Sequence, residues 1–329
     1  MPLFACVVFY NHLILEMFPR LFSCYCFLVL IIYLHYSTSG GLLFPWHIGS
    51  LTALSHHGYL TNNNPIAGSS AGAIATASHA ANVAPEAALD ATLRISDECR
   101  ELGQARGNLL PLLSKELHSL LGEDVHEVFN KREAIVGLAY REIFPNNRPV
   151  LDTYFDSKDH VVDSICNSSM FPFFSSNFPC RFARRTGFLP RIVVDGYFSV
   201  DRERFGCPCF NTMDHPRKTM NDEESDRSSI VDRTISLSVF PHEVLKVDAF
   251  ETHDQISPQL ENPDDASEQM STLFRLATEC GTMEDYHMLY EKGWEDAERW
   301  ISEENRRGYW GSSSQEKRQY YAKFLGDLN

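Results

Sequence analysis

The sequence predicts an α/β fold in which helices cover both faces of a mostly parallel sheet. Strands and helices alternate near the start of the chain: an apolar strand at 31–36 precedes a helix that ends at Gly58, and a short strand leads through Gly68 into a helix over 71–82. Such alternation favours parallel strand pairing. In addition, 43% of the 329 residues are hydrophobic, which is enough to bury a sizeable core.

The rest of the chain continues the mixture of helices and strands. Residues 86–121 have a strongly apolar helical pattern, and we expect further helices on the outside of the domain over 267–303. Other expected elements are strands at 133–143, 149–155, 191–196 and 233–240, a helix from Ser157 or Lys158, an aromatic loop at 171–182 and a polar loop at 212–229. We therefore divide the chain into an apolar N-terminal segment (1–36), an α/β domain (37–250) and a helical extension (251–329).

Charge and cysteine content exclude some classes of function. The net charge of −15 argues against a nucleic-acid partner, because a polyphosphate would be repelled. The nine cysteines are scattered, and none form the Cys-x-x-Cys spacing of a zinc site. Cys207 and Cys209 flank a single proline, which does not indicate a metal by itself. An odd number of cysteines without a compact framework suits reduced thiols inside a cell.

The N-terminal segment allows three interpretations. Residues 21–36 carry no formal charge, but the run is shorter than the ~20 residues that span a bilayer comfortably. A signal peptide fits poorly, since a basic start and a small-residue cleavage site are not evident. The segment is a membrane anchor, a buried first strand with an apolar extension, or an upstream piece outside the working protein. We favour a strand at 31–36.

The stretch Gly68-Ser69-Ser70-Ala71-Gly72 lies between the short strand and the alanine-rich helix. A serine hydroxyl becomes an effective nucleophile when a base takes its proton and nearby donors stabilise the resulting oxyanion. A sharp strand-to-helix turn exposes such a serine, and the flanking glycines allow a close approach of the backbone. The pattern makes Ser70 a candidate nucleophile in a turn shaped by Gly68 and Gly72. The alternative is that these small residues only let a helix pack closely on a strand.

A glycine turn upstream offers donors for the oxyanion. Gly40 and Gly41 follow the first expected strand, and in a parallel sheet this turn would lie beside that of Ser70. The backbone N–H groups of Gly40, Gly41 and Leu42 are therefore candidates for an oxyanion hole. An ordinary glycine turn is the alternative.

An aspartate downstream offers a base. Asp195 ends an apolar strand and precedes Gly196, so its carboxylate is placed to accept the serine proton without a histidine. Asp-Gly pairs are also common in turns with no catalytic role. The three features together, in this order, favour catalysis.

Four segments carry a resemblance to a known family: "SGGLLFPWHIG", "PIAGSSAGAI", "SICNSSMFP" and "VVDGYF". In that order they resemble the oxyanion segment, the nucleophile elbow, the loop before the second catalytic segment and the Asp-Gly segment of the patatin-like phospholipases. The similarity runs from about residue 37 to 245. Two positions depart from the family pattern: Ser39 replaces a glycine, and Tyr197 follows Asp-Gly in place of glycine or alanine.

The resemblance implies a three-layer α/β/α patatin-like fold with a mostly parallel central sheet. It also implies a lipid acyl hydrolase that cleaves acyl esters of phospholipids, galactolipids or triacylglycerols. Ser70 would form the acyl-enzyme with Asp195 as general base, and no metal or other cofactor would be needed. The implied partner is a lipid or membrane surface, so the protein is expected to be membrane-associated or cytoplasmic with interfacial binding; the oligomeric state is left open.

Two other functions are compatible with the sequence. An α/β-hydrolase with a Ser–Asp–His triad would take its histidine from His215, His242 or His253, although its elbow would follow several strands. A catalytically silent lipid-binding protein of the same fold is favoured by the departures at Ser39 and Tyr197.

The aromatic loop is a candidate for membrane contact, because apolar tips beside cations suit the lipid headgroup layer. Its side chains are Phe171, Phe173, Phe174 and Phe178, followed by Arg181, Arg184 and Arg185. The alternative is that these phenylalanines fill the core beside the active site.

Overall fold

The computed structural model describes residues 41–183, 189–211, 213, 231, 233–245, 254–260 and 266–308. The strand expected at 31–36 and the alternatives for residues 1–36 lie outside the described residues, as does most of the polar loop. Within the described ranges, no helix is both long and apolar enough to cross a membrane.

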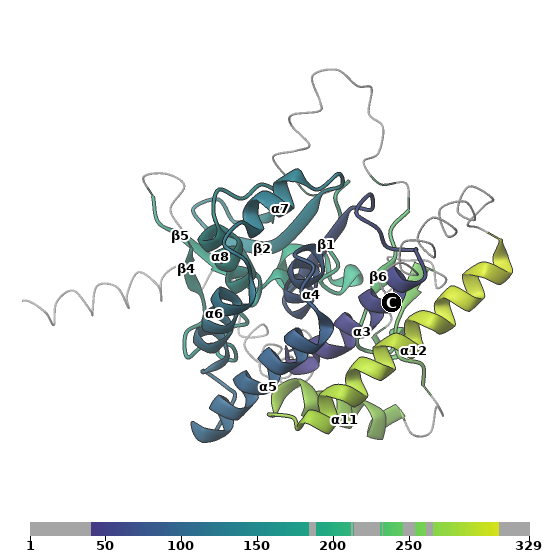
Figure 1. Ribbon diagram of the computed structural model, residues 1–329. Coiled ribbons are helices and arrows are strands. Elements are labelled where there is room, and N and C mark those ends of the chain that lie inside the picture. Colours follow the sequence, from purple (N-terminus) through teal and green to yellow (C-terminus); the bar gives the residue numbers. More distant parts are fainter. Residues whose placement is uncertain are drawn as a thin grey trace, which may run out of the picture. The chain divides into compact units, whose positions relative to one another are not determined.

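Helices and strands alternate along the described chain (Figure 1). The strands are β1 (Ile66–Ser69), β2 (Val136–Phe144), β3 (Arg148–Asp152), β4 (Arg181–Ala183), β5 (Arg191–Val194), β6 (Ser236–Leu237) and β7 (Gln255–Ile256). The helices are α3 (Phe44–His56), α4 (Ala71–Ala80), α5 (Pro85–Glu101), α6 (Leu109–Leu120), α7 (Val125–Lys131), α8 (Lys158–Ser168), α10 (His242–Leu245), α11 (Ala266–Thr278) and α12 (Met283–Arg307). Short 3-10 helices are η2 (Gly41–Leu43), η3 (Gly196–Ser199) and η4 (Arg202–Arg204).

The helical stretch expected over 86–121 is two helices, α5 and α6. Gly103 and Gly107 lie between them with φ angles of 81° and 86°. These left-handed conformations are accessible to glycine and end a right-handed helix. The helices expected over 267–303 are α11 and α12.

The larger sheet is organised around β2, which pairs with three other strands. β1 runs parallel to the first half of β2 and ends opposite Ala139, and β5 runs antiparallel to the second half and ends opposite Arg141. β3 pairs with the middle of β2, overlapping the registers of both β1 and β5, so it occupies the other edge. β1 and β5 therefore lie along the same edge of β2 and run toward each other.

The prediction of a mostly parallel sheet is not confirmed. In the described part of the chain, β1–β2 is parallel, whereas β2–β3, β2–β5 and β4–β5 are antiparallel. β2 and β3 are joined by residues 145–147, a connection too short for the crossover that parallel neighbours need. A separate two-stranded sheet pairs β6 and β7 in parallel. The fold is thus α/β with a mixed sheet.

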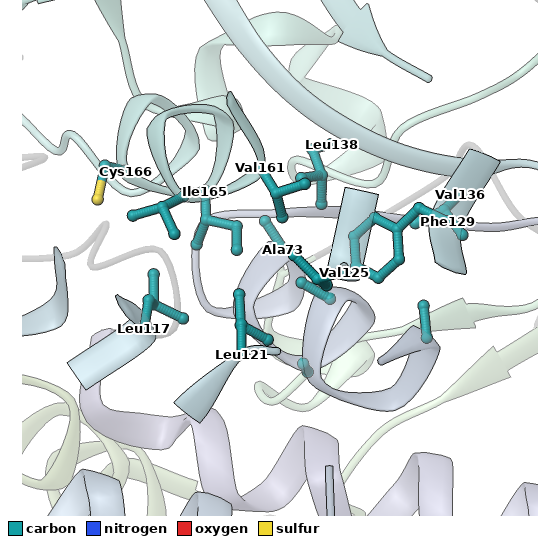
Figure 2. Close-up of a cluster of buried hydrophobic side chains, with 14 of the residues drawn as sticks. Ala73, Leu117, Leu121, Val125, Phe129, Val136, Leu138, Val161, Ile165 and Cys166 are labelled. Atoms are coloured by element: carbon teal, nitrogen blue, oxygen red, sulfur yellow. The ribbon is translucent and has the colours of Figure 1, made fainter. Parts of the chain in front are cut away.

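Helices cover one face of this sheet and form the main hydrophobic core with it. Figure 2 shows Val136 and Leu138 of β2 among side chains from α4, α6, α7 and α8. On the opposite face, Ala139 packs with Phe210 and Met213, which follow η4 in irregular chain. Among the described residues, this second cluster contains none from an α-helix, so a three-layer arrangement is not confirmed.

The C-terminal helix α12 packs closely along α3 (Figure 1). A Cβ added at Gly49 would clash with the backbone of α12, and one added at Gly293 would clash with the backbone of Trp46. Ser50 Oγ donates a hydrogen bond to the carbonyl oxygen of Gly293 at 2.9 Å, and Trp46 Nε1 donates to Asp296 Oδ2 at 2.9 Å. Two glycines thus bring the helix backbones together, and side-chain hydrogen bonds hold them in register.

Candidate active site

The turn between β1 and α4 holds Ser70 in a conformation that residues other than glycine seldom adopt. Its φ and ψ angles are 51° and −124°, a strained combination that the surrounding structure must maintain. The neighbouring Ser69 directs its Oγ to the carbonyl oxygen of Gly206, at 2.6 Å. This sharp strand-to-helix turn is the backbone geometry that a nucleophile elbow requires.

Gly68 and Gly72 contribute differently to this turn. A Cβ at Gly68 would clash with the backbone of Gly72 and lie 2.6 Å from Thr76 Oγ1, whereas a Cβ at Gly72 meets no atom within 4 Å. We expect Gly68→Ala to lower the free energy of unfolding by about 2 kcal/mol, because the backbone would have to shift. Gly72→Ala should unfold at or slightly above the wild-type temperature. Thermal denaturation of both variants checks this, and equal losses would contradict the difference in packing.

The carboxyl ends of β1 and β5 meet on one edge of β2, and this brings the two candidate catalytic residues together. The last residues of the two strands lie opposite Ala139 and Arg141, and Tyr140 is the residue between them. Ser70 and Asp195 follow directly after these strand ends. The sequence predicted a mostly parallel sheet; instead, β1 and β5 run in opposite directions and point their carboxyl ends at each other.

The Asp195-Gly196 turn packs directly against the serine turn. A Cβ added at Gly196 would clash with the carbonyl oxygen of Ala139 and lie 2.6 Å from Ser69 Cβ. Asp195 is fully buried, and its Oδ1 accepts a hydrogen bond from the backbone N–H of Tyr197 at 2.8 Å. Asp195 thereby caps η3, a position at which backbone donors stabilise a carboxylate.

Ser168, at the end of α8, joins the two turns and was not predicted as a site residue. Its Oγ accepts a hydrogen bond from the backbone N–H of Ser70 at 2.9 Å and donates one to the carbonyl oxygen of Ala139 at 2.5 Å. It also lies 2.8 Å from the position that a Cβ on Gly196 would take. The segment "SICNSSMFP" marks a serine at a helix end, but sequence alone does not tell which backbone groups it contacts.

The candidate oxyanion residues lie at the start of α3. Gly40 is outside the described residues, while Gly41 and Leu42 belong to η2, which continues directly into α3. η2 packs against α4, the helix that follows Ser70. The first N–H groups of a helix have no acceptor within the helix, so Gly41 and Leu42 lie where backbone donors are available.

A cavity of about 340 Å³ opens beside Ser70. Apolar side chains that line it include Leu51, Leu54, Leu60, Ile66, Phe205, Phe210, Val239 and Trp300. Tyr197 also lines the cavity, whereas Asp195 is not among the lining residues. A mostly apolar cavity of this size, with a polar group at its wall, is typical of sites for small organic ligands.

Among the described residues, the histidine that lines this cavity is His47 of α3. Burial lowers the pKa of His47 to about 4, so its imidazole is neutral at pH 7. The histidines considered for a triad lie elsewhere: His242 Nδ1 is 2.9 Å from Ser257 Oγ, and His215 and His253 are outside the described residues. His47 was not predicted, because nothing in its local sequence shows that it faces a cavity.

The aromatic loop divides between core and surface. Phe171 is buried, whereas Phe173 and Phe178 are 42% and 69% exposed. Arg181 forms an ion pair with α8, and residues 184–185 lie outside the described residues. The loop therefore anchors one ring in the core and presents others to solvent.

Comparison with known proteins places the chain in a family. A sequence model of the family described as patatin-like phospholipase matches residues 38–203, about half of the 329 residues. The matched region contains Ser70, Asp195 and the turns that hold them. No curated protein matched the chain. The chain therefore belongs to the patatin-like phospholipase family, whose general activity is the hydrolysis of acyl esters in lipids.

Proposed function

We propose that the protein cleaves acyl esters of phospholipids, galactolipids or triacylglycerols through an acyl-enzyme on Ser70, with Asp195 as general base. The observation that carries this proposal is the meeting of β1 and β5 on one edge of β2. It puts a strained serine turn and an Asp-Gly turn in direct contact, with Ser69 2.6 Å from the position of a Cβ on Gly196.

The proposed reaction has two halves. Ser70 Oγ attacks the ester carbonyl carbon while the carboxylate of Asp195 takes its proton, and N–H groups of Gly40, Gly41 and Leu42 stabilise the oxyanion. The C–O bond of the ester then breaks, and the departing alcohol takes the proton from Asp195. In the second half, water attacks the acyl carbonyl carbon while Asp195 takes its proton. The bond from this carbon to Ser70 Oγ then breaks, Ser70 takes the proton from Asp195, and the fatty acid leaves. Neither half requires a metal or other cofactor.

The cavity and the exposed rings support a lipid as the substrate. A fatty acyl chain is apolar, and the side chains beside Ser70 offer an apolar wall from α3, β1 and α12. Phe178 and Phe182, four residues later on β4, are 69% and 62% exposed. Such rings enter the headgroup layer of a bilayer. We therefore propose a lipid or membrane surface as the partner. The protein would reach it either through a membrane anchor or by binding at the surface.

The experiment that tests this function is covalent labelling of the full chain with a fluorophosphonate, which reacts with activated serines. Hydrolysis of p-nitrophenyl butyrate and of phosphatidylcholine vesicles would be measured beside it, with a chelator present. We expect the label to attach to Ser70 and the labelled protein to lose both activities. The chelator should leave the activities of the unlabelled protein unchanged. Ser55→Ala, on α3 and outside the cavity lining, is the control and should keep both label and activity. Labelling of another serine would overturn the assignment.

A catalytically silent lipid-binding protein is the second candidate. Tyr197, which follows the Asp-Gly pair, lines the cavity beside Ser70 and packs its ring against Phe205. A large ring in this place narrows the approach to the serine. If the folded protein pelleted with vesicles but neither took the label nor released fatty acid, this second function would replace the first.

A further inference from the structure

Two cysteines that are far apart in the sequence pack in one apolar cluster, where the connection between α11 and α12 meets α5. Cys99 lies on α5 and is buried in an apolar cluster with Leu42, Ile95 and Ala105, and Cys280 packs against the same cluster from the connection between α11 and α12. The two thiols are close enough that Cys280 contributes to the raised pKa of Cys99. Both are free thiols in the structure.

The backbone on each side of this pair is held in place by independent contacts. Arg100 Nη2 donates a hydrogen bond to the carbonyl oxygen of Gly281 at 2.9 Å. The backbone N–H of Gly281 in turn donates to the hydroxyl of Tyr286 at 3.1 Å, and that hydroxyl is hydrogen-bonded to Ser96. The residues next to both cysteines are thus fixed to the opposite segment, which keeps the two sulfurs together.

We propose that Cys99 and Cys280 form a reversible disulfide when the protein meets a small-molecule disulfide such as oxidised glutathione. The inference depends on the packing of both cysteines in one cluster and on the hydrogen bonds that join their segments, and it is independent of the proposed function. A disulfide needs its two Cα atoms within about 7 Å. Two cysteines that pack in one cluster, on segments joined through the neighbouring residues Arg100 and Gly281, can meet this requirement.

The burial of each sulfur sets the order of the exchange. Burial raises the pKa of both thiols, that of Cys99 to about 12, and Cys280 is the more accessible of the two, because this residue is half-buried. Cys280 therefore attacks first: its thiolate bonds to one sulfur of oxidised glutathione and expels the other half as a thiolate, which takes up a proton. Cys99 then loses its proton and attacks the Cys280 sulfur, releasing the second glutathione. The two protein thiols are oxidised, and one glutathione disulfide is reduced to two thiols.

The bridge would tie the C-terminal helices to α5. It would close a loop from 99 to 280 that contains β2, α8 and the Asp195-Gly196 turn, and closing a loop of this length restricts the unfolded chain strongly. In a reducing compartment the pair would stay open, so the bridge would report on the surrounding thiol–disulfide balance.

The test is incubation of the full chain with oxidised glutathione, followed by non-reducing peptide mapping and thermal denaturation. We expect a cross-linked peptide pair containing Cys99 and Cys280, and a rise in Tm of roughly 5 °C that dithiothreitol reverses. Cys280→Ser should show neither the cross-linked pair nor the reversible rise. Cys180→Ser is the matched control, because Cys180 is also half-buried and burial alone raises its pKa.

Two results would overturn the proposal. One is a peptide map in which Cys99 and Cys280 stay unlinked, or pair with other cysteines, while the protein is folded. The other is an equal, reversible rise in Tm for wild type and Cys280→Ser, which would place the effect at another site. The Tm values of wild type, Cys280→Ser and Cys180→Ser are compared first in their reduced forms. This comparison separates a loss of folding from a loss of the disulfide.

Discussion

Asp195→Asn is expected to lower kcat for ester hydrolysis by about 10³-fold, or about 4 kcal/mol in activation free energy. Asparagine has nearly the same shape as aspartate, and its amide oxygen can still accept the hydrogen bond from the Tyr197 N–H that Oδ1 accepts at 2.8 Å. The turn should therefore persist while the base is lost. Steady-state kinetics with p-nitrophenyl butyrate measure the change, and near-wild-type Tm would show that the fold is kept.

His47→Gln is the control for this prediction, because His47 lines the same cavity and is neutral at pH 7. We expect its kcat to stay within a few-fold of wild type. If His47→Gln lost activity and Asp195→Asn did not, a histidine would be the base and the proposed dyad would be wrong.

Gly293→Leu should lower the free energy of unfolding by about 3 kcal/mol. A Cβ at this position would clash with the backbone of Trp46, and backbone atoms have no alternative rotamer to adopt. Leucine favours a helix over glycine by about 0.5–1 kcal/mol, so the expected loss is the net of the two effects. Separation of the helices would also stretch the hydrogen bond from Ser50 Oγ to the Gly293 carbonyl oxygen, now 2.9 Å.

Thermal and urea denaturation measure this effect against a matched variant. Glu295→Leu introduces the same side chain on α12 at an exposed position, two residues along the chain. Its Tm should stay within a few degrees of wild type. Equal stability of Gly293→Leu and Glu295→Leu would show that α12 does not pack on α3 through this glycine.

The sequence was most informative where chemistry depends on a few neighbouring residues. The small residues around Ser70 predicted a strand-to-helix turn, and the structure has β1 ending at Ser69 and α4 beginning at Ala71. Similarly, Asp195 was expected at the end of a short apolar strand, and it directly follows Val194, the last residue of β5. Both predictions rest on local backbone preferences, which a short stretch of sequence contains.

Strand direction and long-range contacts were harder to predict. The alternation of strands and helices suggested parallel pairing. The sheet is mixed instead, because β3 follows β2 after a short connection and because β5 runs antiparallel to β2. Ser168 and His47 joined the site through contacts that depend on how α8 and α3 pack, and local pattern does not encode those contacts. Phe171 and Phe178 look alike in sequence, yet one ring is buried and the other 69% exposed.

The opposed strands on one edge of β2 have a consequence for how the chain tolerates changes in length. β1 ends opposite Ala139 and β5 ends opposite Arg141, with Tyr140 between them. These three residues of β2 therefore set the distance between Ser70 and Asp195. One residue added or removed there would change the distance between the two strand ends by about 3.3 Å. A change of this size is too large for a hydrogen bond between Ser70 and Asp195 to be kept. Insertions in the surface loops would leave this spacing unchanged, so we expect the chain to tolerate changes in length there but not at Ala139, Tyr140 and Arg141 of β2.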